Sequence, residues 1–238
     1  MPKTYKADSV PSLEDIDNPQ QSRRKFLRNA GFAGLLVTGA AGCQKIWDQF
    51  PHGGHGGNKP VDLGSGDTGI LNYAYALEQL EAAFYTRVCL TPYLSMDAME
   101  AKYLKDIRNH EVAHREFFKN ALGAKAIMQL EVDFSSIDFT SRTSVLATAK
   151  AFEDLGVSAY NGAGSLISSG DYLLLAGKIV SVEARHAAYI RNLIERGTFA
   201  DSTVIDANGL DTSRKPSEVL PIAQKYLKTK LDGSHLPS

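Results

Sequence analysis

Two segments of the chain each place a glutamate three residues before a histidine within an apolar helical pattern. The first pair is Glu111 with His114, and the second is Glu183 with His186. Residues three and four apart share one face of a helix, so each pair lies on the same side as the apolar residues around it. Burial of a carboxylate and an imidazole without partners costs free energy. Because both groups are good ligands of transition metals, the repeated spacing indicates a metal site inside a helical bundle.

Each pair is preceded by another helical segment with a glutamate on its apolar stripe. These glutamates are Glu78 and Glu153, and each has a tyrosine seven residues later, Tyr85 and Tyr160. The two halves of the chain therefore repeat one pattern, and the repeat extends to residues that would lie beside the ligands. Glu81 adds a fifth carboxylate to the stripe of Glu78. The sequence leaves open whether Glu81 replaces Glu78, supplements it, or accepts a hydrogen bond beside the site.

The residue set predicts two metal ions. A glutamate from each of two helices, with a Glu-x-x-His pair from each of the other two, is the set found in di-iron and di-manganese carboxylate bundles. Four carboxylates balance the charge of two divalent cations, which makes their burial tolerable. Mixed oxygen and imidazole ligands suit iron, manganese or zinc better than calcium, magnesium or copper(I). We expect two divalent ions, iron first and manganese as the alternative.

Four helices must position these groups. Apolar periodicity and turn signals predict helices at about 69–89, 95–123 and 143–167, and a fourth helix that follows a tight turn at 168–171 and continues to 197. Asp67 or Thr68 is expected to cap the first of them. The connections are short, long and short, and the long one, at 124–142, should cross the bundle surface in extended form. This pattern predicts an all-α fold, an antiparallel four-helix bundle with a long crossover between its second and third helices. A short C-terminal helix, at about 217–228, is expected to pack on the outside.

Composition fits one globular domain with extensions. The 238 residues are 43% hydrophobic and 22% charged, and the formal net charge of −1 gives no electrostatic basis for a nucleic-acid partner. The predicted layout is an export signal at 1–43, a flexible tether at 44–68, the bundle at 69–197 and a tail with a short helix at 198–238.

The N-terminal segment predicts export. Arg23 and Arg24 precede a weakly apolar run at 30–42, which resembles a bacterial twin-arginine signal and is too short for a comfortable membrane span. The alternative is a basic patch before a buried helix. Cys43 follows a segment that resembles a lipoprotein cleavage site, so it is a candidate for lipidation, with plain cleavage as the alternative. We expect the protein in the periplasm or cell envelope, in contact with a membrane only through such a lipid anchor. Cys89 should be a core residue without a structural disulfide.

The chain resembles the ferritin-like superfamily, and specifically the exported bacterial ferritin-like proteins related to plant desiccation-associated proteins. The segments that carry the resemblance are 77–85, 110–114, 152–157 and 183–186. The resemblance covers about 69–196. It implies that Glu111 and Glu183 bridge two metal ions. The ligands that it implies are Glu78, Glu111, His114, Glu153, Glu183 and His186.

Three functions are compatible with these residues. The first is a di-metal oxidoreductase that oxidises divalent iron or reacts with oxygen or peroxide. The second is a non-catalytic, metal-stabilised envelope protein that protects against stress such as drying or binds a partner. The third is a zinc protease, because His110, Glu111 and His114 also match His-Glu-x-x-His. Val182 stands where the second copy would need that first histidine, which disfavours the protease. A homo-oligomer is compatible with the sequence, whereas the tether and tail disfavour a closed storage cage.

Overall fold

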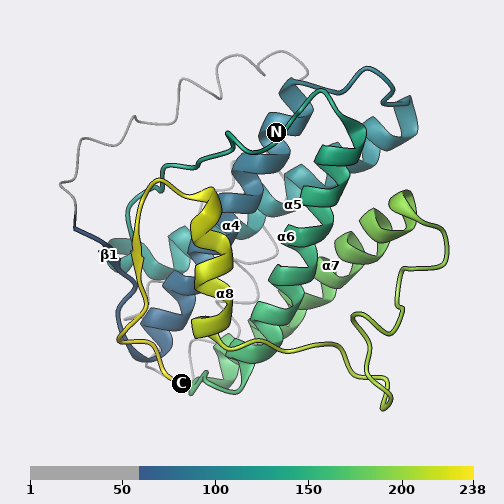
Figure 1. The fold of residues 1–238 in the computed structure, drawn as a ribbon. Coiled ribbons are helices and arrows are strands. Elements are labelled where there is room, and N and C mark those ends of the chain that lie inside the picture. The colour runs from purple at the N-terminus through teal and green to yellow at the C-terminus, as the bar shows by residue number, and fades with distance from the viewer. Residues whose placement is uncertain (1–58) are drawn as a thin grey trace, which may run out of the picture.

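The computed structural model describes residues 59–238, and four long helices form its centre (Figure 1). They are α4 (Gly66–Leu90), α5 (Ala98–Leu122), α6 (Arg142–Gly164) and α7 (Gly170–Ile194). Helix α4 packs along α5, and α6 packs along α7. Side chains such as Phe84, Leu104, Leu146 and Ile190 fill the space between the helices and are at most 1% exposed. The predicted all-α bundle is confirmed, and within residues 59–238 no helix is both long and apolar enough to span a membrane.

Side chains and turns set the ends of the helices. The Asp97 carboxylate accepts hydrogen bonds from two backbone amides in the first turn of α5, and the hydroxyl oxygens of Ser141 and Ser169 each accept one such bond in α6 and α7. Gly123 ends α5 with a φ of 53°, a conformation that glycine adopts without steric cost, and the short 3₁₀ helix η1 (Gly123–Lys125) follows. These residues produce the short, long and short connections of the bundle.

The first helix starts earlier than expected, and Asp67 has a different role. Ser65 occupies the N-cap position of α4, which begins at Gly66 rather than at Gly69. The two carboxylate oxygens of Asp67 accept hydrogen bonds of 2.8 Å from the backbone amides of Ser168 and Ser169. Asp67 therefore ties the start of α4 to the turn between α6 and α7 and does not cap its own helix. Asp67 thus accepts backbone hydrogen bonds as a cap residue does, but from amides about a hundred residues away.

The segment before α4 is not a free tether over its described part. Strand β1 (Val61–Asp62) pairs in parallel with β2 (Leu231–Asp232), so the two ends of the described chain lie side by side. The expected tether at 44–68 is therefore wrong for its last residues. The predicted export signal, Cys43 and the rest of the tether lie outside the described residues.

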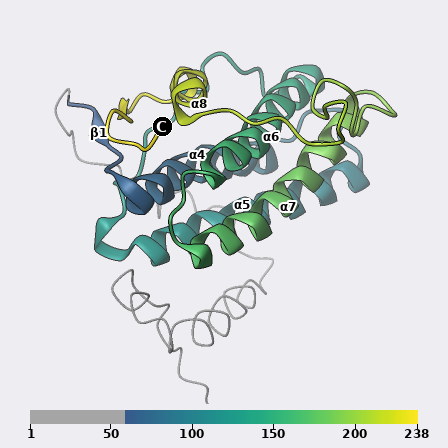
Figure 2. The same ribbon diagram turned by 90° about the horizontal axis from the view of Figure 1, so that it is seen from below.

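The crossover and the tail both cover the bundle. Phe134 and Phe139 in the crossover contact Phe84 of α4, with ring centroids 6.1 and 5.9 Å away. In the tail, α8 (Pro216–Ala223) continues into the 3₁₀ helix η2 (Gln224–Tyr226). Helix α8 lies over α4 and α6, on the side away from α5 and α7 (Figure 2). The predicted short outer helix is present, but α8 ends at Ala223 rather than near residue 228.

The tail approaches α6 most closely at Gly162. A Cβ atom there would lie 1.8 Å from the backbone oxygen of Arg214. Beside it, Arg214 donates its backbone amide to the Ser158 carbonyl and a guanidinium N–H to the Ser158 hydroxyl, at 2.9 and 2.7 Å. Only glycine fits at position 162 without moving the tail.

We expect Gly162→Ala to destabilise the fold and Gly177→Ala to stabilise it. The first change forces the tail off α6, at a cost on the order of 1–3 kcal/mol for overpacking. Gly177 lies within α7 with no atom near its missing Cβ, so alanine there should add about 0.5–1 kcal/mol through helix propensity. Chemical unfolding of both variants measures the difference. Equal stabilities would show that the tail does not dock at this point.

Candidate metal centre

All four bundle helices contribute acidic or imidazole side chains to one interior region. Helix α4 carries Glu78 and Glu81, α5 carries Glu111 and His114, α6 carries Glu153, and α7 carries Glu183 and His186. The four carboxylates outside Glu81 have no exposed surface at all. Such complete burial of several carboxylates requires cations or protons as partners.

Each of the two histidines faces three carboxylates. The Nδ1 atom of His114 lies 2.8 Å from Glu183 Oε1, 3.5 Å from Glu78 Oε2 and 3.8 Å from Glu111 Oε2. The two shared carboxylates recur around the second histidine. The Nδ1 atom of His186 lies 2.8 Å from Glu111 Oε1, 3.5 Å from Glu183 Oε2 and 3.6 Å from Glu153 Oε2. Glu111 and Glu183 thus each direct one carboxylate oxygen toward His114 and the other toward His186.

These contacts define two groups whose ligand atoms converge. Within each group, one atom from every residue lies within 4.8 Å of the others, and the groups are Glu78, Glu111, His114 and Glu183, and Glu111, Glu153, Glu183 and His186. The atoms are close but poorly aligned for hydrogen bonding to one another. Both oxygens of Glu111 and of Glu183, and Nδ1 of both histidines, are buried without a hydrogen-bond partner. Carboxylate oxygens and imidazole nitrogens that converge without hydrogen bonds to one another fit a metal site.

The two tyrosines that repeat in the sequence cross between the halves of the bundle. Tyr85 of α4 donates its hydroxyl proton to Glu153 Oε1 of α6, and Tyr160 of α6 donates to Glu78 Oε1 of α4, each at 2.5 Å. This exchange requires α4 and α6 to run antiparallel. Each tyrosine occupies one oxygen of a glutamate and leaves the other oxygen free to face a histidine.

Glu81 lies beside the cluster and belongs to neither group. It is 4% exposed, and its carboxylate lies against Gly156 of α6, where a Cβ atom would be 3.0 Å from Oε1. Burial, followed by the negative charges of Glu111 and Glu183, raises the pKa of Glu81 well above its usual range. Of the two candidates on the first helix, Glu78 enters a group and Glu81 lies next to it.

His110 has a role that the sequence did not reveal. Its Nδ1 atom lies 2.9 Å from Nε2 of His186, and the two rings stack with centroids 5.1 Å apart. The imidazole of His110 is in neither group of candidate ligands, so the zinc-protease reading gains no support. When His186 faces the carboxylates through Nδ1, its Nε2–H can donate to His110, which fixes the tautomer of this candidate ligand. In the sequence, this role of His110 is indicated only by its position next to Glu111, at the edge of the buried stripe.

The charges of the cluster are strongly coupled. Burial raises the pKa of Glu111 to about 8 and that of Glu153 to about 6. Burial acts in the same direction on Glu183, but the nearby imidazoles of His114 and His186 outweigh it and hold its pKa at about 2. Burial opposes the charged form of both histidines, yet the surrounding carboxylates raise their pKa values. The cluster without metal therefore retains protons, which divalent cations would displace.

A bundle of four antiparallel helices with glutamates and Glu-x-x-His pairs at its centre defines the ferritin-like class of proteins. The family model described as the ferritin-like domain matches residues 66–196. This match spans α4 to the end of α7 and more than half of the chain, so the chain belongs to that family. The search of curated proteins found no match.

We expect Glu111→Gln to stabilise the metal-free protein at alkaline pH. The folded protein holds the Glu111 proton more tightly than the unfolded chain, so stability falls as the pH rises from about 4.5 to about 8. Glutamine cannot ionise and avoids this loss, which predicts a gain on the order of 1–3 kcal/mol at pH 8 that vanishes near pH 4.5.

Chemical unfolding of the metal-free protein at several pH values checks this expectation. The exposed Glu131 of the crossover provides the control, since Glu131→Gln should change stability little at any pH. A variant Glu111→Gln that is less stable than the unmodified protein at pH 8 would contradict the charge assignment.

Proposed function

We propose that this ferritin-like protein binds two divalent metal ions, iron or manganese, and oxidises divalent iron with oxygen or peroxide. The observation that carries the proposal is the sharing of Glu111 and Glu183 between two convergent groups of ligand atoms. Shared carboxylates with an oxygen for each group suit two neighbouring ions better than one. Two redox-active divalent ions held there would supply two electrons to the oxidant, one from each ion.

The protein's own residues prepare the site for this chemistry. Tyr85 and Tyr160 orient the two unshared glutamates, and each leaves one oxygen of its partner available. His110 orients His186 from the outside. The surrounding core keeps the shared carboxylates out of water, which strengthens their attraction for cations. Four carboxylates around two divalent ions give a neutral buried site.

Metal analysis of glutamate-to-glutamine variants tests the number of ions. We expect about two iron or manganese ions per unmodified chain. Glu111→Gln or Glu183→Gln should remove both ions because both groups use these residues, whereas Glu78→Gln or Glu153→Gln should mainly weaken one. Glu81→Gln is the matched control on the same helix and should retain both. Elemental analysis of protein purified without oxygen measures these counts, and one zinc ion dependent on His110 would instead favour the protease.

The same variants test turnover. Oxidation of divalent iron by oxygen or peroxide should be lost in Glu111→Gln while circular dichroism shows an intact helical fold. Full turnover in Glu111→Gln would contradict the proposed catalytic function. Two bound ions without turnover in the unmodified protein would favour the alternative, a non-catalytic envelope protein that the metals stabilise.

We also propose that the protein is exported to the periplasm or cell envelope. Support comes from the Arg23-Arg24 pair and the apolar run after it. Replacement of both arginines by lysine should leave the protein in the cytoplasm, and Cys43→Ser should abolish any lipid attachment without preventing export. Cell fractionation and mass spectrometry of the mature protein measure both effects. Unchanged export of the double lysine variant would show that the segment is not a twin-arginine signal.

A further inference from the structure

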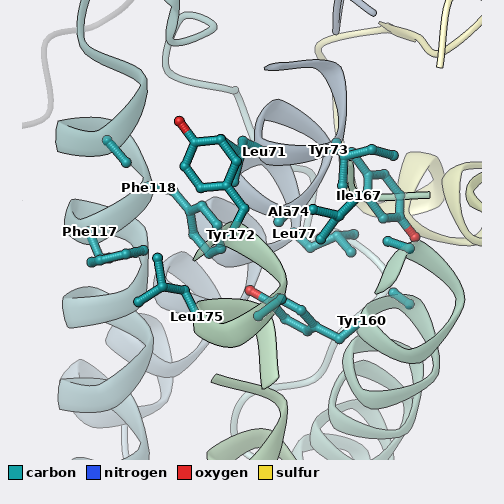
Figure 3. Close-up of a pocket in the computed structure, with 15 residues that line it drawn as sticks. Leu71, Tyr73, Ala74, Leu77, Phe117, Phe118, Tyr160, Ile167, Tyr172 and Leu175 are labelled. Carbon is teal, nitrogen blue, oxygen red and sulfur yellow. The ribbon is translucent and has the colours of Figure 1, made fainter. Parts of the chain in front are cut away.

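A narrow apolar cavity lies between the four helices, close to the candidate metal centre (Figure 3). The centre of a water-sized sphere can reach about 20 Å³ of it. Phe118 of α5, Tyr160 of α6 and Leu175 of α7 surround the same space, with Leu71 and Ala74 of α4 on the remaining side. No acidic, basic or histidine side chain lines it, and the tyrosines are the only lining residues with polar side-chain atoms.

The cavity and the cluster share one wall. Tyr160 lines the cavity with its ring and donates its hydroxyl proton to Glu78. The ring of Phe118, one helical turn after His114, packs against that of Tyr160 with centroids 6.4 Å apart. A molecule in the cavity is therefore separated from the ligands by a single layer of side chains.

The other end of the cavity reaches toward the surface. Phe117, Ile167 and Ala176 line it and are half-buried, whereas Ala74, Phe118 and Leu175 are at most 8% exposed. The lining thus runs from the buried Tyr160 to half-buried residues of α5 and α7.

Size and polarity select the occupant. A cavity of about 20 Å³ holds one very small molecule, because a single water needs at least about 10–15 Å³ by the same measure. Apolar cavities stay dry and take apolar guests such as xenon. Peroxide would lose hydrogen bonds there, and a divalent cation would lose its hydration shell without gaining a ligand.

We propose that this cavity is a binding site for dioxygen that supplies the metal centre. The assignment of dioxygen as a reactant rests on the proposed function, while the binding of a small apolar gas does not. The inference selects dioxygen over peroxide as the oxidant that the interior of this bundle accommodates. It also gives Tyr160 a second role as the barrier between gas and ligands.

Xenon binding tests the site without any turnover. In crystals of the unmodified protein under xenon pressure, one xenon atom should lie between Phe118, Tyr160 and Leu175. Leu175→Phe should fill this space and exclude xenon. Leu174→Phe is the matched control, because Leu174 is the neighbouring residue on α7 and is 53% exposed. Absence of xenon from the unmodified protein would overturn the proposal.

Kinetics of the metal-loaded protein test the connection to the centre. In Leu175→Phe we expect the KM for dioxygen to rise about fivefold or more, with unchanged metal content and unchanged peroxide-driven turnover. Leu174→Phe should leave all three unchanged. An unaltered KM in a variant that no longer binds xenon would overturn the proposal. Turnover with peroxide but not with dioxygen would also overturn the proposed dioxygen site, although it would agree with the proposed metal chemistry. Xenon binding without turnover by either oxidant would contradict the proposed function itself.

Discussion

The structure depends on the burial of four carboxylates and two imidazoles at the centre of one bundle. Glu78, Glu111, Glu153 and Glu183 have no exposed surface, and in a medium of low polarity their negative charges repel one another strongly. The arrangement is tolerable only where cations or protons offset that repulsion. Binding of metal to these side chains would therefore change the free energy of unfolding directly.

An approximate twofold repeat organises the cluster, and the places where it fails are informative. Tyr85 and Tyr160 exchange hydrogen bonds with the glutamates of the opposite helix, which sets the register of α4 against α6. The repeat fails at Glu81, three residues after Glu78, because the position three residues after Glu153 is Gly156. The small glycine leaves room for the Glu81 carboxylate. It fails again at His110, because Val182 occupies the equivalent position. The two halves of the site are thus chemically different.

Periodicity explains what could be predicted from the sequence. The helices and the grouping of Glu111 with His114 follow from spacings of three and four, which depend on local geometry alone. The contact of Asp67 with the turn at 168–169 could not be predicted, since a cap residue appears the same whether it bonds its own helix or another. The pairing of His110 with His186 likewise depends on how α5 and α7 rotate against each other. Tertiary packing decides such contacts.

The position of Tyr160 separates two environments that the proposed chemistry needs. On one side its hydroxyl meets the buried carboxylate of Glu78, and on the other its ring closes an apolar cavity. Charged ligands hold cations, but they offer nothing to a neutral apolar gas. An apolar cavity suits such a gas better than it suits water, which would lose its hydrogen bonds there. A tyrosine satisfies both requirements, because its ring is apolar while its hydroxyl bonds an oxygen that would otherwise be buried without a partner. Phenylalanine at this position would keep the cavity and lose that hydrogen bond, so the repeated tyrosine is better explained by the cluster than by packing of the core.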